Sequence, residues 1–229
     1  MVSTSPRDPA ATRARILVAA TREFARHGIG GARVDRLARA AKANKRMLYY
    51  YFGDKDGLFR AVLENAYAGI RSAEHDLNLL ALSPIDGVRR LVGFTWTYFL
   101  EHPEFLTLLN TENLHRGRHL KRAKTLQAIN SPIIEMLAEL LQRGERTGEL
   151  RRGVDALQLY ISIAGMCAFY LSNNYTLSSV FDRDLGDPAH RPARLAHMED
   201  LVLGYVTNRE KTPVTRVVNR PVKIAGPQA

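Results

Sequence analysis

The stretch at residues 32–59 reads ARVDRLARAAKANKRMLYYYFGDKDGLF. Apolar residues recur at helical spacing from 34 to 41, and Leu48 and Phe52 continue an apolar face four residues apart, so each of two short helices can bury one side. The opposite side carries donors and cations that nothing in the sequence neutralises. This pattern predicts a helix-turn-helix that lays its second helix, at about residues 44–51, in a groove of DNA.

Three blocks of motif residues lie at fixed spacing around this stretch. They read T-R-x-x-I-L-x-A-A-x-x-x-F-A-x-x-G at residues 12–28, V-x-x-L-A-x-A-A at 34–41 and N-K-x-x-L-Y-Y-Y-F-x-x-K-x-x-L at 44–58. Together they resemble the DNA-binding domain of the tetracycline-repressor (TetR) family of bacterial transcription regulators. The resemblance implies a dimer, with DNA contacts at the positions of Lys45, Tyr49, Tyr51 and Lys55.

The chain departs from the family pattern at the turn between the two helices. Lys42 stands where the family usually has glycine, so the turn either needs no positive φ or tolerates its strain. Asn44 replaces the usual Ser or Thr and still predicts an N-cap. Arg33 replaces one of a common pair of Thr residues, and we expect it to take over a phosphate contact. The junction at 31–33 and the run at 48–52 are most similar to the branch that contains the pyrimidine-utilisation repressor, and no ligand is inferred from that similarity.

Side chains in the first turn of the second helix reach base edges when such a helix lies in the major groove. Lys45 and Arg46 occupy that turn, and Arg bound to guanine is the commonest specific contact. Tyr hydroxyls can hold phosphates, as can a Lys at a helix start. Core packing is the alternative role for Met47 and Tyr50. The predicted DNA contacts are Arg33, Asn44, Lys45, Arg46, Met47, Tyr49, Tyr50, Tyr51 and Lys55.

The basic residues concentrate at the helix-turn-helix. The chain has 229 residues and a formal net charge of +10. Residues 1–57 carry +7, residues 58–209 are neutral, and residues 210–229 carry +3. A neutral body with a basic N-terminal part predicts that a polyanion binds to that part.

The remaining composition is that of a soluble globular protein, with 45% hydrophobic and 24% charged residues. No signal peptide is recognised, and the single Cys167 excludes an intrachain disulfide, so we expect a cytoplasmic location. Cys167 is expected to be a small buried hydrophobe. Residues 156–181 carry no charge, but polar side chains interrupt them, which predicts a buried helix and no membrane span.

Helix start and stop signals divide the chain into a head and a body. With no strand pattern, repeat or glycine-rich phosphate loop, the sequence predicts an all-α fold of about nine helices. Pro132 is expected to break or kink the helix at 118–144. The predicted parts are a flexible arm at 1–10, the helix-turn-helix domain at 11–57, a helical effector-binding and dimerisation domain at 58–209 and a basic tail at 210–229.

The helix expected at 155–174 is apolar nearly all round and must be covered on every side. Together with an apolar stripe on the last helix, at 192–209, it predicts a two-fold dimer through a four-helix bundle. The alternative is a helix that is central within a monomer. The predicted interface residues are Leu157, Ile161, Ala164, Gly165, Ala168, Leu195, Met198, Val202 and Tyr205.

The body also holds more large aromatics and isolated polar groups than a plain helical bundle requires, which predicts a mostly apolar pocket for a small molecule. Core packing is the alternative for each aromatic. The predicted ligand contacts are Tyr67, Trp96, Phe99, Asn110, Asn113, Phe169 and Asn173.

Glu112, His115 and His119 have a spacing that superficially suits a metal, but the glycine and arginines between them favour a solvated helix end. No catalytic residue, metal or cofactor is expected. The leading hypothesis is a homodimeric repressor that binds a palindromic operator and is released by a small-molecule effector. The alternatives are an architectural or partner-controlled DNA-binding protein and an enzyme, and an enclosed cavity of a few hundred Å³ in the body would favour the effector.

Overall fold

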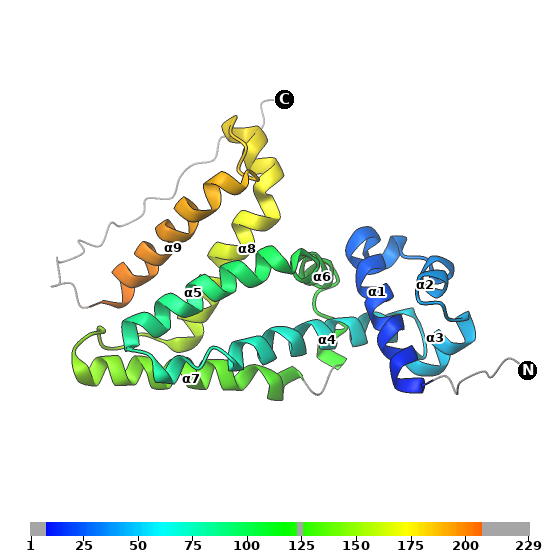
Figure 1. The fold of residues 1–229 in the computed structure, drawn as a ribbon, viewed down its shortest axis with the longest axis horizontal. Coiled ribbons are helices and arrows are strands. Elements are labelled where there is room, and N and C mark those ends of the chain that lie inside the picture. Colours follow the sequence, from blue (N-terminus) through cyan, green and yellow to red (C-terminus); the bar gives the residue numbers. More distant parts are fainter. Residues whose placement is uncertain (1–7, 123–125, 208–229) are drawn as a thin grey trace, which may run out of the picture.

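A small N-terminal head and a larger body, both all-α, are joined through one long helix (Figure 1). The computed structural model describes residues 8–122 and 126–207, with side chains for all of these except 126–131. This part of the chain contains nine α-helices and no strand, which confirms the predicted fold class. The helices are α1 (Pro9–Gly31), α2 (Val34–Ala40), α3 (Lys45–Phe52), α4 (Lys55–His75), α5 (Pro84–Glu101), α6 (Pro103–Leu114), α7 (Leu126–Thr147), α8 (Ala156–Phe181) and α9 (Arg191–Val206).

The head is a bundle of α1, α2 and α3 closed by the first half of α4. Phe24 of α1 is fully buried and meets Phe59 of α4 edge-on, with ring centroids 5.1 Å apart. Leu63 of α4 and Leu108 of α6 belong to the same buried cluster. The head core therefore extends past the boundary predicted at residue 57, because α4 packs its first turns against α1 before it enters the body.

Side-chain caps fix the helix starts that the sequence indicated. The Asn44 carboxamide oxygen accepts a hydrogen bond from the Met47 N–H at 2.9 Å, and the Asp54 carboxylate accepts one from the Gly57 N–H at 2.6 Å. Each cap satisfies a donor that the first helical turn leaves unpaired. The same arrangement begins α5 at Ser83 and α8 at Asp155.

The turn between α2 and α3 tolerates the strain that glycine would avoid. Lys42 has a φ of +50°, in the left-handed region that glycine adopts more readily. Two backbone hydrogen bonds hold this conformation, from the Lys42 N–H to the Arg39 carbonyl at 3.1 Å and from the Ala43 N–H to the Ala38 carbonyl at 3.0 Å. Of the two possibilities left open by the sequence, the strained turn is the one that the chain adopts.

Several predicted bounds are wrong. α1 begins at Pro9, inside the predicted arm, and of the break or kink expected at Pro132 the break does not occur, since α7 continues through that residue. α8 extends past residue 174 to Phe181, where Asp182 ends it with a φ of +48°. The rest of the predicted arm, at 1–7, and the segment at 208–229, with the predicted tail, lie outside the described residues.

Polar side chains join α4 to α8 inside the body. The Arg71 guanidinium pairs with Glu74 and donates to the Tyr160 hydroxyl at 2.8 Å, and that hydroxyl donates to the Glu74 carboxylate at 3.0 Å. Burial raises the pKa of Tyr160 to about 12 and also raises the pKa of Glu74.

Within the described residues, no helix is long and apolar enough to span a bilayer.

One face of α8 is not covered by the described part of the chain. Leu157 and Ile161 are half exposed, Phe169 is 60% exposed, and no other described residue lies within 4 Å of a Cβ built on Gly165. Ala164 and Ala168 are half-buried against the body. On α9 the exposed apolar side chains are Leu201 and Tyr205.

The interface prediction for α9 needs a correction. Met198 and Val202 are buried in the chain's own core, where Met198 packs on Cys167, so neither is free to meet a second subunit. Leu195 is half-buried beside α5.

Burial raises the pKa of the Cys167 thiol to about 12, in keeping with the predicted role of Cys167 as a small buried hydrophobe.

Candidate nucleic-acid interface

The predicted DNA-contacting helix is α3, which presents one polar face to solvent. Its inner face buries Leu48 and Phe52 in the head core. Arg46, Tyr49 and Tyr50 are exposed on the other side, and Tyr50 is 82% exposed. This division gives a helix that is anchored on one side and free to enter a groove on the other.

An acid of α2 lies against the first residue of α3. The Lys45 ammonium is 2.6 Å from the Asp35 carboxylate, and both side chains are exposed. The hydrogen bond from Lys45 to Asp35 raises the pKa of Lys45. The prediction that nothing neutralises these cations is therefore wrong for Lys45. Because solvent screens the pair, a DNA phosphate or base edge can replace Asp35 at little cost.

A half-buried carboxylate positions the start of α2 against α1. Glu23 accepts two hydrogen bonds from the Arg36 guanidinium, at 2.7 and 2.9 Å, and one from the Arg33 N–H at 2.8 Å. The hydrogen bonds from Arg36 are the main reason that the pKa of Glu23 is lowered. Arg33 is thereby held by its backbone while its side chain stays exposed.

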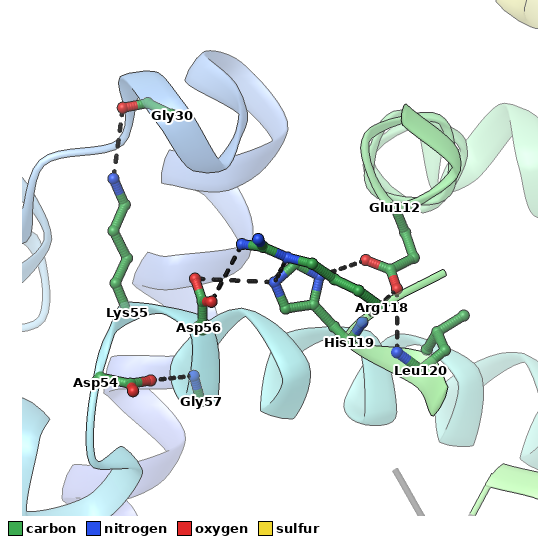
Figure 2. Close-up of polar contacts among 9 residues, drawn as sticks. All are labelled: Gly30, Asp54, Lys55, Asp56, Gly57, Glu112, Arg118, His119 and Leu120. Atoms are coloured by element: carbon green, nitrogen blue, oxygen red, sulfur yellow. Dashed lines mark hydrogen bonds and ion pairs between the residues drawn. The ribbon is translucent and has the colours of Figure 1, made fainter. Parts of the chain in front are cut away.

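The start of α4 closes this side of the head, as Figure 2 shows. The Lys55 ammonium lies 3.4 Å from the Gly30 carbonyl, so it ties α4 to the end of α1. Asp54 caps the helix one residue earlier. The C-terminal end of α1 and the starts of α2 and α4 therefore meet at one edge of the head.

Two of the predicted DNA contacts have packing roles as well. Met47 and Tyr51 are half-buried against the head core, and the Tyr51 ring also lies edge-on to Tyr50 at 5.2 Å. Tyr50 itself faces solvent and does not pack in the core. One basic residue missed by the sequence reasoning is Arg13, whose guanidinium lies over the Phe52 ring at 5.2 Å, beside α3. Only the packing of α1 on α3 brings it there.

Glu112 and His119 join the body to the head. The His119 ring is 2.5 Å from one oxygen of the buried Glu112 carboxylate, and the other oxygen accepts from the N–H groups of His119 and Leu120 at 2.8 and 3.0 Å (Figure 2). Arg118 donates to Asp56 in the first turn of α4 at 3.1 Å. Glu112 is therefore a structural acceptor at the joint between α6 and α4.

The solvated helix end predicted for this segment is wrong at its centre, since Glu112 and His119 are 2% and 3% exposed. His115 lies edge-on to His119 with ring centroids 5.8 Å apart. Among the described residues, no group of three or more His, Cys, Asp or Glu side chains is arranged to hold a metal ion.

The residues predicted to bind a ligand do not converge on one cavity. Trp96 and Phe99 are buried in the body core against Tyr170 and Phe105, and Tyr67 also packs on Phe105. The others lie on α6 and α8: Asn110, Asn113 and Phe169 are exposed, and Asn173 is half-buried. As ligand contacts they stay predictions.

A different hollow lies between α5 and α9. Its volume is about 620 Å³, and Leu77, Phe94 and Leu195 form an apolar wall. Arg90 and Glu199 stand at its polar edge, and a Cβ built on Gly93 would lie 3.9 Å from the Glu199 carboxylate. Sequence reasoning missed this hollow because its wall combines the segment after α4 with α5 and α9, which are far apart in the chain.

We expect Lys45→Ala and Arg46→Ala each to weaken specific DNA binding by about 10- to 100-fold and to reduce the discrimination between bases, because these side chains occupy the first turn of α3, which contacts base edges. Lys55→Ala should weaken binding to all sequences alike. It should also lower the salt slope, which is the steepness with which the logarithm of the binding constant falls with the logarithm of the salt concentration, by about 1 for each head. Titrations on a selected operator and on a scrambled duplex measure both effects. Unchanged operator affinity in the first two variants would mean that α3 does not read the bases.

Comparisons with known proteins agree with this geometry. The description "Bacterial regulatory proteins, tetR family" matches residues 16–62, and "Tetracyclin repressor-like, C-terminal domain" matches residues 84–202. The HTH-type transcriptional repressor NicS of Pseudomonas putida is 40% identical over 192 residues, which cover 84% of this chain and 91% of that protein.

Two solved structures share the fold. The putative transcriptional regulator SCO4942 of Streptomyces coelicolor has a TM-score of 0.62 and 27% identity, over 83% of this chain and 97% of that one. The ketosteroid transcriptional regulator KstR2 of Mycobacterium tuberculosis has a TM-score of 0.64 and 18% identity, over 91% and 100% of the two chains. These relatives are regulators and not enzymes. The chain belongs to the tetracycline-repressor family of DNA-binding transcriptional regulators.

Proposed function

We propose that this protein is a homodimeric repressor that binds a palindromic operator and leaves it when a small molecule occupies the body. The two α3 helices would enter successive major grooves about 34 Å apart. The observation that carries the proposal is the head itself, in which a capped, anchored α3 presents a basic and aromatic face.

Support for the dimer comes from the uncovered face of α8. Leu157, Ile161 and Phe169 remain exposed there beside the small residue Gly165, and Leu201 and Tyr205 extend the apolar surface onto α9. Contiguous apolar surface of this kind marks an interface in soluble proteins. A two-fold contact of α8 and α9 with a second copy would bury it.

Support for a small-molecule effector comes from the hollow between α5 and α9. Its volume of about 620 Å³ lies within the range of ligand sites, and its apolar wall carries few polar groups. Leu77 links the hollow to the segment just after α4, the helix that also carries the head. An occupant that favours one position of α4 would therefore shift the separation of the two heads. This hollow favours an effector-controlled regulator over one without an effector, although it is more open than the cavity expected.

The proposal is tested by selecting genomic fragments at about 150 mM salt with a polyanion competitor. We expect an enriched palindrome of roughly 15–25 base pairs that binds one dimer. Small molecules from a cell extract should release the wild-type protein from it. Gly93→Phe, which fills the hollow, should bind DNA normally and resist release. If no fragment is enriched, the function is wrong, and if Gly93→Phe is released like the wild type, the effector site is wrong.

A further inference from the structure

A second concave surface lies on the head, and α1, α2 and the turn that leads to α3 line it. It is a groove of about 580 Å³ between α1 and α2, which we call the α1–α2 groove. Short side chains, among them Ala14, Val18 and Ala40, form its floor, and Val18 is 52% exposed. Long basic side chains form its walls: Arg15, Arg22 and Arg26 from α1, Arg36 from α2 and Lys42 from the following turn.

The cations of this groove are only partly neutralised. Among the described residues that line it, Glu23 is the one acid, and it is bound by Arg36. Arg22 and Arg26 are exposed, and no hydrogen bond or ion pair to another described residue is found for either. Arg15 donates to the Thr12 hydroxyl at 2.9 Å and keeps its charge. The groove therefore has a positive charge that an anionic partner can neutralise.

The three α1 arginines form a row. They follow one another at intervals of seven and four residues, so they lie on one side of α1 over a length of about 16 Å. A linear row of guanidinium groups suits a partner with regularly repeated anions, since each arginine can bind a phosphate through two N–H groups.

The row ends, at Arg26, near the edge of the head that the DNA backbone is expected to meet. Glu23 fixes both Arg36 in the groove and the backbone of Arg33 at the start of α2. At the same edge, Lys55 of α4 reaches the Gly30 carbonyl at the end of α1. The groove therefore continues the predicted phosphate contacts along α1, on the same rigid bundle.

We propose that the α1–α2 groove binds backbone phosphates of the duplex that flanks each operator half-site, in addition to the contacts of α3. The inference rests on the proposed function, because it requires the head to be on DNA. Double-stranded DNA fits better than an acidic protein segment, since the groove adjoins the DNA-contacting edge and its cations are arranged in a row. Such contacts add affinity without base preference.

The test uses the full-length protein and two duplexes, the selected operator trimmed to its palindrome and the same operator with about 10 base pairs added at each end. The variant is Arg22→Gln with Arg26→Gln. Arg146→Gln with Arg152→Gln is the matched control, because it removes the same charge from exposed positions of the body. Affinity is measured as a function of salt, and far-UV helicity shows that each variant is folded.

We expect the wild type and the control to bind the long duplex about tenfold more tightly than the short one. The Arg22/Arg26 variant should lose this gain, and its salt slope on the long duplex should fall by about 2 to 4, because a dimer loses up to four phosphate contacts. Lysine at both positions should restore the slope.

The inference is overturned if the Arg22/Arg26 variant keeps the wild-type salt slope and still binds the long duplex more tightly than the short one. That result would mean that the groove does not contact flanking DNA, and an acidic protein segment would then be its partner. It is equally overturned if the wild type does not distinguish the two duplexes. In both cases operator binding remains, so the proposed function is unaffected. A wild type that binds neither duplex contradicts the function itself.

Discussion

Replacing Glu112 with alanine is expected to lower the free energy of unfolding by about 3–5 kcal/mol, because the change removes an acceptor from a buried site. The N–H groups of His119 and Leu120 and the His119 ring all bond to the Glu112 carboxylate. Alanine leaves these groups unpaired where little water reaches them, since His119 is 3% exposed. Urea unfolding measured by far-UV circular dichroism gives the difference.

Two further variants separate this effect from a general loss of charge. Glu112→Gln keeps an oxygen acceptor for the two N–H groups and can offer its amide to the ring, so its loss should be clearly smaller. Glu135→Ala removes an exposed carboxylate of α7 and should change stability by less than about 0.5 kcal/mol. If Glu112→Ala were as stable as Glu135→Ala, the hydrogen bonds at the α6–α4 joint would not stabilise the fold.

Gly165→Trp is expected to convert the dimer to a monomer and to weaken operator binding by 100-fold or more. Within residues 8–122 and 126–207, nothing lies within 4 Å of a Cβ at this position, so the protomer can accept the new side chain, whereas a closely packed second α8 cannot. A monomer binds one half-site at a time and loses the high local concentration of the second head. Ala168 is a weaker choice, because it is half-buried against its own core.

Sedimentation and operator titration measure the two effects together. Asn65→Trp is the matched control, since it places the same side chain on an exposed position of α4, away from the α8 face. The control should remain dimeric and bind operator normally. A Gly165→Trp protein that is still a dimer with normal affinity would place the interface on other helices, α6 and α7 being the next candidates.

Local rules account for what the sequence alone determined. A capping side chain and the N–H group that donates to it lie three residues apart, so Asn44 identified the start of α3 without any tertiary contact, and Asp54 begins α4 by the same rule. Helical spacing likewise identified the buried face of α3, at Leu48 and Phe52. The family resemblance depended on the same compact segment. The basic charge of the head is a sum over the sequence and needs no fold.

What the tertiary structure decided depends on contacts between distant parts of the chain. α8 has two apolar stripes of similar character, and only the packing of α5, α7 and α9 determines which of them is buried. For the same reason Met198 and Val202 of α9 face inward.

The burial of the Glu112–His119 pair is another case, because Phe59 of α4 lies edge-on to the His119 ring at 4.9 Å. Its spacing allowed a metal site, a solvated helix end or a buried hydrogen bond, and periodicity does not distinguish them. The chain turns back just after α6, where Arg116 and Gly117 have positive φ, and this brings the N–H groups of residues 119 and 120 onto the carboxylate. The hollow between α5 and α9 and the α1–α2 groove arise in the same way, because a concave surface is formed by the shape of several helices together and by no single segment.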